Sequence, residues 1–396
     1  MTSGARTFNL FCLLWLVGMS TRITILAVPP VIPLIRDDLR MTETQVGLLV
    51  GLPVLTWALA AIPGSLLIAR LGATFTLAAG LALTGLAAAG RGAAPDVWVL
   101  YAATMLMGCG IAVMQPALPT LVREWVPHHI GLGTAVSSNG MMVGVAAGPA
   151  LTIPFVLPLL DQSWRLAFLW WAAPVLMLAL LFPLLAPRMT EVTSAEIGIP
   201  RRWWPDWKNP LIWLLGLTFG ANNSLYYGTN AFLPDYLASG GRADLIGAAL
   251  GFMNGSQFVA SILLLVTADR LQNRVWPYLV FGPAAFLGVV GVVFGDGLWV
   301  VAAAALIGFS LAITFVVTLA LPPVLSPPGD VHRMSAGMFT VSFSCAVIVP
   351  IVCGALWDLT GLPWTAFLLL LLCPLLLTAL GFALSLHGRT SRRASV

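Results

Sequence analysis

Apolar runs long enough to cross a lipid bilayer recur from one end of this 396-residue chain to the other. A transmembrane helix needs about 20 mostly apolar residues to cover a hydrocarbon core of about 30 Å. Hydrophobic residues make up 59% of the sequence and charged residues only 9%, far below the ~25% that is usual in a soluble domain. The chain has too few charged residues to form a water-exposed surface around so much apolar sequence. We therefore expect a protein that passes through a lipid bilayer many times.

The apolar pattern predicts an all-α membrane protein with twelve transmembrane helices. The predicted ranges are 8–34, 43–68, 73–92, 97–121, 131–158, 164–186, 209–233, 243–267, 275–295, 298–321, 334–357 and 362–386. A charged stretch interrupts the pattern after the sixth range. The sequence therefore predicts an N-terminal six-helix bundle over 1–187, a cytoplasmic linker over 188–208, and a C-terminal six-helix bundle with a short cytoplasmic tail over 209–396.

The distribution of basic residues among the loops predicts the orientation. With a cytoplasmic N-terminus, thirteen of the nineteen Lys and Arg residues fall inside, which agrees with the positive-inside rule. Five fall outside, namely Arg36, Arg40, Arg91, Arg165 and Arg242. We expect a bacterial inner-membrane protein with both termini in the cytoplasm. The loop bias accounts for the net charge of +4, so no nucleic-acid partner is expected.

The predicted spans lack the residue patterns that enzyme catalysis or cofactor binding would require. No Asp, Glu or His falls at mid-membrane depth, so neither an acid–base pair nor a proton relay can be assembled there. The five cysteines lie in apolar segments without metal-ligand spacing, and we interpret them as packing residues. We therefore predict no enzyme activity, no metal and no cofactor.

The remaining basic residue, Arg22, falls near the middle of the first predicted helix. An arginine at this depth costs roughly 2.5–3.5 kcal/mol on insertion scales and stays protonated. Because no carboxylate lies at that depth, we predict that an anionic substrate supplies the negative charge. A planar guanidinium fork suits a carboxylate or a similar small planar anion. The alternative is that Arg22 reaches the interface or bonds helix carbonyls.

Other polar or aromatic side chains of the spans are candidates to line the same cavity. Trp15, Met19 and Pro29 share the helix face of Arg22, although such a stripe is also typical of plain packing. Weaker candidates, each equally explained by helix–helix hydrogen bonds, are Gln115, Asn139, Asn254 and Gln257.

A polar stripe runs along the helix predicted over 209–233. The helical period places five polar side chains within an arc of about 140°. They are Asn222, Asn223, Tyr226, Tyr227 and Asn230. A polar stripe is untenable in lipid, so we expect it to face inward. It is interpreted as substrate-binding, with hydrogen bonding between helices as the alternative.

Two short loops and a glycine-rich helix resemble motifs of the major facilitator superfamily. Asp269 and Arg270 lie in a loop similar to the superfamily signature D-R-x-G-R, and the equivalent earlier loop keeps Arg70 and Gly72 but has Ala69 in place of the aspartate. The range 140–149, with Gly140, Gly144, Gly148 and Pro149, resembles the antiporter motif, although its small-xxx-small spacing is also generic packing. The resemblance implies two pseudo-symmetric bundles, alternating access and a gating role for the two loops.

Within that superfamily the chain resembles the cyanate permease and 2-nitroimidazole transporter (CynX/NimT-like) family. The matches are dispersed over 31–39, 52–55, 164–168, 219–234 and 358–361. In the first helix, where that family has N-L-R-P, this chain reads Ser20-Thr21-Arg22-Ile23 and keeps only the arginine.

The resulting hypothesis is a secondary active or facilitated transporter of a small anion, such as a carboxylate or a cyanate-like ion. Arg22 and the polar face of 209–233 would hold the substrate. An inside-negative potential opposes anion entry by roughly 2.3 kcal/mol per 100 mV, so we favour exchange with a counter-substrate, facilitated flux, or a proton that enters with the substrate. Apart from the lipid bilayer we expect no further partner and a monomer. The alternative hypothesis is an exporter of neutral or weakly acidic aromatic drugs.

Overall fold

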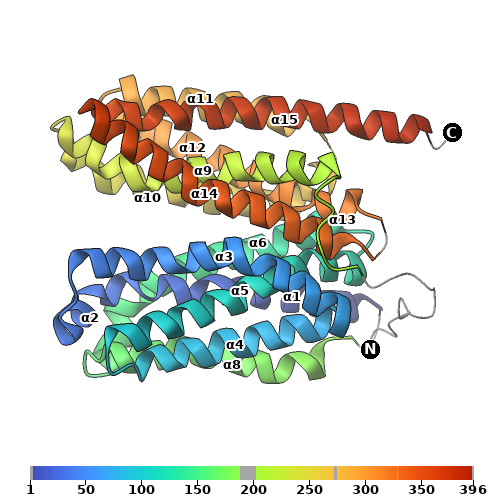
Figure 1. Ribbon diagram of the computed structural model, residues 1–396, viewed down its shortest axis with the longest axis horizontal. Helices are drawn as coiled ribbons and strands as arrows, with labels where there is room; N and C mark the ends of the chain where they lie inside the picture. Colours follow the sequence, from blue (N-terminus) through green and yellow to red (C-terminus); the bar gives the residue numbers. More distant parts are fainter. Residues whose placement is uncertain (1–2, 188–201, 272–273, 328, 395–396) are drawn as a thin grey trace. The chain divides into compact units, whose positions relative to one another are not determined.

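The computed structural model describes residues 3–187, 202–271, 274–327 and 329–394, and all regular structure in these ranges is helical (Figure 1). Twelve long helices confirm the predicted number. They are α1 (Ser3–Leu26), α3 (Glu43–Leu71), α4 (Ala73–Gly92), α5 (Val97–Trp125), α6 (Ile130–Leu151), α8 (Trp164–Leu185), α9 (Pro210–Ser239), α10 (Ile246–Leu271), α11 (Trp276–Phe294), α12 (Leu298–Leu319), α14 (Val331–Thr360) and α15 (Ala366–Ala394). Short elements flank them: η1 (Pro29–Val31), α2 (Ile32–Leu39), η2 (Thr152–Val156), α7 (Leu157–Leu159), η3 (Ala243–Leu245), α13 (Leu321–Leu325) and η4 (Pro363–Thr365).

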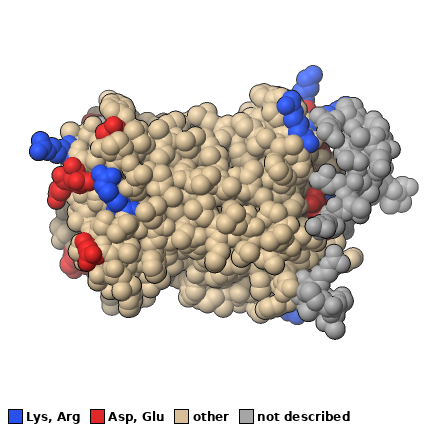
Figure 2. Space-filling model, turned by 90° about the horizontal axis from the view of Figure 1, so that it is seen from below, with Lys and Arg blue, Asp and Glu red and all other residues tan. Residues whose placement is uncertain are grey.

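In the described part of the chain, eleven helical spans are long and apolar enough to cross a membrane. The long helix that is not among them is α9, which carries the predicted polar stripe. On the face seen in Figure 2, charged side chains lie at the two ends and an uncharged surface lies between them. This distribution is typical of a protein whose middle is covered by lipid.

The chain divides into two compact units. The first contains Met1–Asp206 and Leu325–Ala336, and the second contains Trp207–Val324 and Gly337–Val396. In the first unit, α1 packs against α6, while α4 packs against α5 and α8. In the second unit, α12 packs against α10 and α11, and α15 packs against α9 and α11. The predicted boundaries at 187 and 209 stay a prediction, and most of the predicted linker lies outside the described residues.

The first membrane span is broken, whereas the sequence predicted a continuous helix over 8–34. The helix α1 ends at Leu26, and the chain continues through η1 into α2. Pro29 and Pro30 explain the break, because a proline has no N–H to donate to the preceding turn. The predicted placement of Pro29 on the helix face of Arg22 is therefore wrong. Arg22 still lies in the middle of the span Thr7–Leu39.

Glycines bring α1 and α6 into direct backbone contact. A Cβ atom added to Gly140 or Gly144 of α6 would collide with backbone carbonyls of α1. A Cβ on Gly18 of α1 would likewise meet the carbonyl of Ser137. At Gly144 such an atom would lie 3.2 Å from the Cβ of Arg22. The glycine-rich range of α6 therefore packs the helix that carries Arg22.

Candidate functional site

Arg22 lies over the face of an aromatic ring and has no acidic partner. Its guanidinium carbon is 4.4 Å from the ring centroid of Trp57, a residue of α3 that is 2% exposed. The arginine itself is half-buried. In the described part of the chain, its guanidinium forms no ion pair with any carboxylate. A ring over the face of the guanidinium stabilises the charge and leaves the in-plane N–H groups for an acceptor.

The aromatic and polar neighbours on α1 and α6 bond to each other. The indole Nε1 of Trp15 donates to Oδ1 of Asn139 at 2.9 Å. Asn139 is 8% exposed, and Met19 is half-buried on the same helix as Trp15. The bond agrees with the helix–helix interpretation of Asn139, and the predicted role of these three residues in substrate binding stays a prediction.

Gln115 of α5 carries an unused amide donor. The residue is 5% exposed, and its Nε2 has no hydrogen-bond acceptor within the described ranges. A buried amide without an acceptor is destabilising by about 1–3 kcal/mol unless something else accepts its hydrogens. The role of Gln115 in substrate binding stays a prediction.

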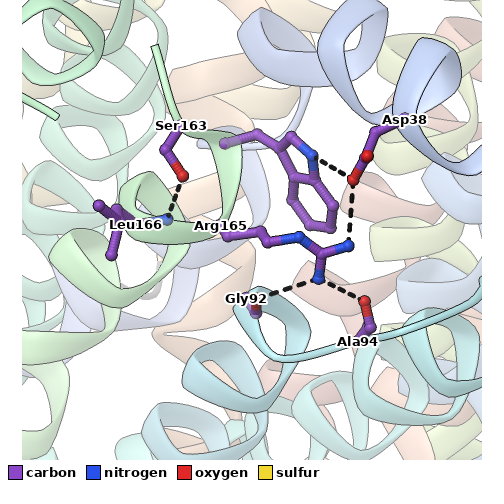
Figure 3. A network of polar contacts seen from close by, with 7 residues as sticks. Asp38, Gly92, Ala94, Ser163, Arg165 and Leu166 are labelled. Atoms are coloured by element: carbon purple, nitrogen blue, oxygen red, sulfur yellow. Dashed lines mark hydrogen bonds and ion pairs between the residues drawn. The ribbon is translucent and has the colours of Figure 1, made fainter. Parts of the chain in front are cut away.

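A polar network at the ends of α2, α4 and α8 anchors the segment that follows the break in α1 (Figure 3). Arg165 of α8 donates from Nη2 to Oδ2 of Asp38 at 3.0 Å and from Nη1 to the carbonyl of Ala94 at 2.5 Å. The indole of Trp164 donates to the same oxygen of Asp38 at 3.1 Å. The ion pair is partly exposed, so it contributes little energy, but it fixes where α2 lies in the first unit.

Arg91 is not the outer-loop residue that the sequence predicted. It belongs to the last turn of α4 and is 1% exposed. Its Nη1 donates to the carbonyl of Thr24 at 3.1 Å, and its guanidinium carbon is 4.3 Å from the ring centroid of Phe168. The side chain of Arg91 therefore points into the first unit, where its guanidinium contacts residues of α1, α5 and α8.

Two of the three asparagines of the polar stripe, Asn222 and Asn223, bond to neighbouring helices of the second unit. Nδ2 of Asn222 donates to Oγ1 of Thr314 at 2.6 Å and to the carbonyl of Leu311 at 3.1 Å, both on α12. Nδ2 of Asn223 donates to Oγ of Ser342 on α14 at 2.9 Å. Both asparagines are no more than 5% exposed. These contacts agree with the alternative interpretation, in which the stripe joins helices.

The C-terminal part of the stripe forms a hydrogen-bonded cluster with α10. The hydroxyl of Tyr226 and the amide of Gln257 donate to Oδ1 of Asn254 at 3.1 and 3.2 Å. Asn254 donates in turn to Oδ1 of Asn230 at 3.3 Å. The ring of Tyr227 lies edge-on to that of Tyr226, with centroids 5.2 Å apart. Asn254 is therefore the centre of the cluster, and the roles of these residues in binding stay predictions.

The two predicted gating loops begin at helix ends. Arg70 is exposed in the last turn of α3, and Gly72 ends that helix with a φ of 82°, a value that favours glycine. Asp269 is half-buried and Arg270 is exposed in the last turn of α10. A gating role for the four residues stays a prediction.

Sequence reasoning missed Trp57 and the burial of Arg91. Trp57 is one of fifteen tryptophans, and nothing in its neighbours separates it from the others. For Arg91 there was a usable signal, because the predicted range 73–92 already included this residue in the helix.

Comparisons with known proteins agree with the helical architecture. The sequence profile of the Major Facilitator Superfamily matches residues 10–350. The chain is 26% identical over 373 residues to the 2-nitroimidazole transporter of Escherichia coli (strain K12), with 91% of each sequence covered. It is also 26% identical over 373 residues to the cyanate transport protein CynX of the same strain, covering 93% of this chain and 95% of that protein. The crystal structure of the transporter FucP in the outward conformation is similar in fold, with a TM-score of 0.70 at 16% identity, covering 95% of this chain and 98% of that one.

A double-mutant cycle tests whether the polar stripe joins helices. We expect Asn223→Ala and Ser342→Ala to be coupled by about 0.5–1.7 kcal/mol, because each substitution removes one partner of the same buried hydrogen bond. The free energy of unfolding of the two single variants and the double variant, measured in mild detergent, gives the coupling. Coupling near zero, together with loss of transport by Asn223→Ala at unchanged stability, would make Asn223 a ligand-binding residue instead.

Proposed function

Because this chain belongs to the Major Facilitator Superfamily of membrane transporters, we propose that it carries a small anion across the bilayer by alternating access. The chain is a multi-pass membrane transporter and not an enzyme. The substrate is a carboxylate, a cyanate-like ion or an anion of similar size, and Arg22 is the residue that contacts its negative charge.

The observation that carries this proposal is the uncompensated charge of Arg22. An arginine cannot lose its proton in a protein, and a charge at mid-span needs water or an anion beside it. The ring of Trp57 lies against the face of the guanidinium. Among the described residues, no carboxylate forms an ion pair with its N–H groups. The N–H edge is the part of an arginine that binds planar anions in a bidentate manner. Since Arg22 is half-buried rather than enclosed, a substrate can reach it and leave again.

Relatives support the chemical class of the substrate. One is a cyanate transport protein and another is a 2-nitroimidazole transporter, each at 26% identity. Cyanate is a small linear anion, which a guanidinium edge can bind. Asn222 and Asn223 of α9 form hydrogen bonds inside the second unit, so we assign the recognition of charge to the first unit.

Similarity to the 2-nitroimidazole transporter supports a second candidate function, the export of neutral or weakly acidic aromatic drugs. Cation–π contact with Trp57 would then leave Arg22 to bind a nitro group rather than a full negative charge. Competition separates the two functions, because small carboxylates and cyanate inhibit transport of the true substrate only if the site is selective for anions.

Replacement of Arg22 tests the proposal directly. Arg22→Gln removes the charge but keeps a polar side chain of similar length. We expect the apparent KM for anion uptake into proteoliposomes to rise about 10- to 150-fold, because a hydrogen bond to a charged group contributes about 1.5–3 kcal/mol. Arg22→Lys keeps the charge without the planar fork, so we expect a smaller loss.

The matched control is Arg40→Gln, which removes one positive charge from an exposed position at the end of α2. Its uptake should equal that of the wild type. Normal uptake by Arg22→Gln, or an equal loss in both variants, would refute the role of Arg22.

Counterflow in proteoliposomes tests how transport is driven. The predicted spans contain no acidic or histidine side chain at mid-depth, so we propose exchange, facilitated flux or entry of a proton with the substrate. We expect anion counterflow to proceed without an imposed pH gradient. Strict dependence on a proton gradient, for a substrate whose pKa keeps it ionised, would require a protein proton carrier and contradict this view.

A further inference from the structure

The guanidinium of Arg91 is enclosed inside the first unit and only part of it is used. Its side chain projects from the last turn of α4 among residues of α1, α5 and α8. The residue is 1% exposed, and its neighbours Met107 and Phe168 are 0% and 2% exposed. Unlike Arg22, this arginine is shielded from any solution on either side of the membrane.

The protein satisfies one nitrogen of Arg91. Nη1 donates to the carbonyl of Thr24 at 3.1 Å and approaches the sulfur of Met107 at 3.3 Å. Nε and Nη2 are buried and have no acceptor within the described chain. No carboxylate of the described residues pairs with Arg91 either.

The bond to Thr24 has its own structural role, which does not account for the two unused nitrogens. Thr24 lies two residues before the end of α1, where Pro29 and Pro30 interrupt the helical hydrogen bonds. The amide of Val28 donates to Ile25, at 3.2 Å, rather than to Thr24. Arg91 therefore caps a free carbonyl at the break in the helix.

A second unused group belongs to the same residue of α1. The hydroxyl oxygen of Thr24 is buried and has no hydrogen-bond partner, and Thr24 is 2% exposed. This hydroxyl belongs to the same residue whose carbonyl bonds Nη1 of Arg91. Two residues joined by one hydrogen bond, Thr24 of α1 and Arg91 of α4, thus both carry buried polar atoms without a partner in the described chain.

The chemistry of these groups selects an anion. Nε and Nη2 can only donate, and the Thr24 hydroxyl can rotate to donate as well. The ring of Phe168 and the C-terminal end of α4 offset part of the positive charge, but neither accepts the remaining hydrogens in the plane of the guanidinium. A permanent charge without a counter-ion is strongly unfavourable in an enclosed apolar setting.

We propose that Arg91 and Thr24 form a structural site for one small monovalent inorganic anion, which is chloride under ordinary conditions. The apolar walls formed by Met107 and Phe168 exclude organic anions. The site is distinct from Arg22: the transported substrate exchanges at the half-exposed arginine, while the anion at Arg91 stays enclosed and stabilises the broken end of α1 against α4.

Thermal unfolding of the purified full-length protein tests the site. At constant pH and ionic strength, we expect sodium chloride and sodium bromide to raise the Tm by about 2 °C over sodium gluconate at tenfold excess over the Kd. Gluconate is too large to enter. A Tm that is equal in halide and gluconate overturns the proposal.

Variants test whether the halide-dependent rise in Tm comes from the site at Arg91 and Thr24. Thr24→Val keeps the shape of the side chain and the carbonyl that Arg91 bonds, so we expect it to fold and to show a smaller halide shift. Thr104→Val is the matched control, because Thr104 is 1% exposed in the same unit and its hydroxyl bonds the carbonyl of Leu100 at 2.8 Å. The control and Arg22→Gln should keep the full shift. A shift lost in Arg22→Gln, or equal in Thr24→Val and Thr104→Val, overturns the assignment.

Anomalous scattering from bromide gives a readout that needs no variant. Crystals grown in sodium bromide should show an anomalous peak within about 3.5 Å of the Nε and Nη2 atoms of Arg91. Density without an anomalous signal at saturating bromide would mean that water occupies the position, and the proposal would then be wrong. Because neither readout involves transport, the proposal can fail while the function assigned to Arg22 stands, and the reverse.

Discussion

The contact between the Arg22 guanidinium and the Trp57 ring is the interaction on which the functional account depends. It holds a permanent charge in the middle of a membrane span, on a face of α1 that the protein leaves without an acid. Aromatic contact of this kind contributes roughly 0.5–2 kcal/mol, which is less than the cost of placing the charge there. The remainder must come from water or from an anion that reaches the free edge, and that requirement makes the arginine a binding group.

The rest of the first unit determines where that charge lies. Glycines of α6 allow the backbone of α1 to approach closely, and the proline pair ends α1 one turn after Arg22. The carbonyl that the break exposes is capped by Arg91, and the following α2 is tied to α8 through Asp38 and Arg165. Residues far apart in the sequence thus fix one short stretch of helix from both sides.

Much of the fold could be predicted from the sequence, because a bilayer demands long apolar helices and the loops carry the charges. The range 73–92 matches α4 to the residue, and twelve long helices form where twelve were expected. The break in α1 was missed because periodicity ignores which backbone N–H groups a proline removes. The burial of Arg91 was missed because it depends on how α1, α5 and α8 pack around the end of α4. Trp57 could not be singled out because its partner comes from another helix.

The candidate site was predicted less completely than the fold. Arg22 could be identified from the sequence because it is the basic residue that the predicted loops do not account for. The asparagines of α9 were correctly expected to turn inward, but a helical wheel cannot tell a ligand group from a group that bonds α12 or α14. That distinction depends on partners such as Thr314 and Ser342, whose positions follow from packing alone.

The central claim is that cargo, rather than protein, neutralises Arg22. An experimental structure of the transporter bound to the small carboxylate or cyanate that most raises its Tm would test this claim most directly. The account predicts an anion atom within about 2.7–2.9 Å of a guanidinium nitrogen of Arg22, with the Trp57 ring still on the other face. An anion bound elsewhere, or an Asp or Glu side chain in contact with the Arg22 guanidinium, would contradict it.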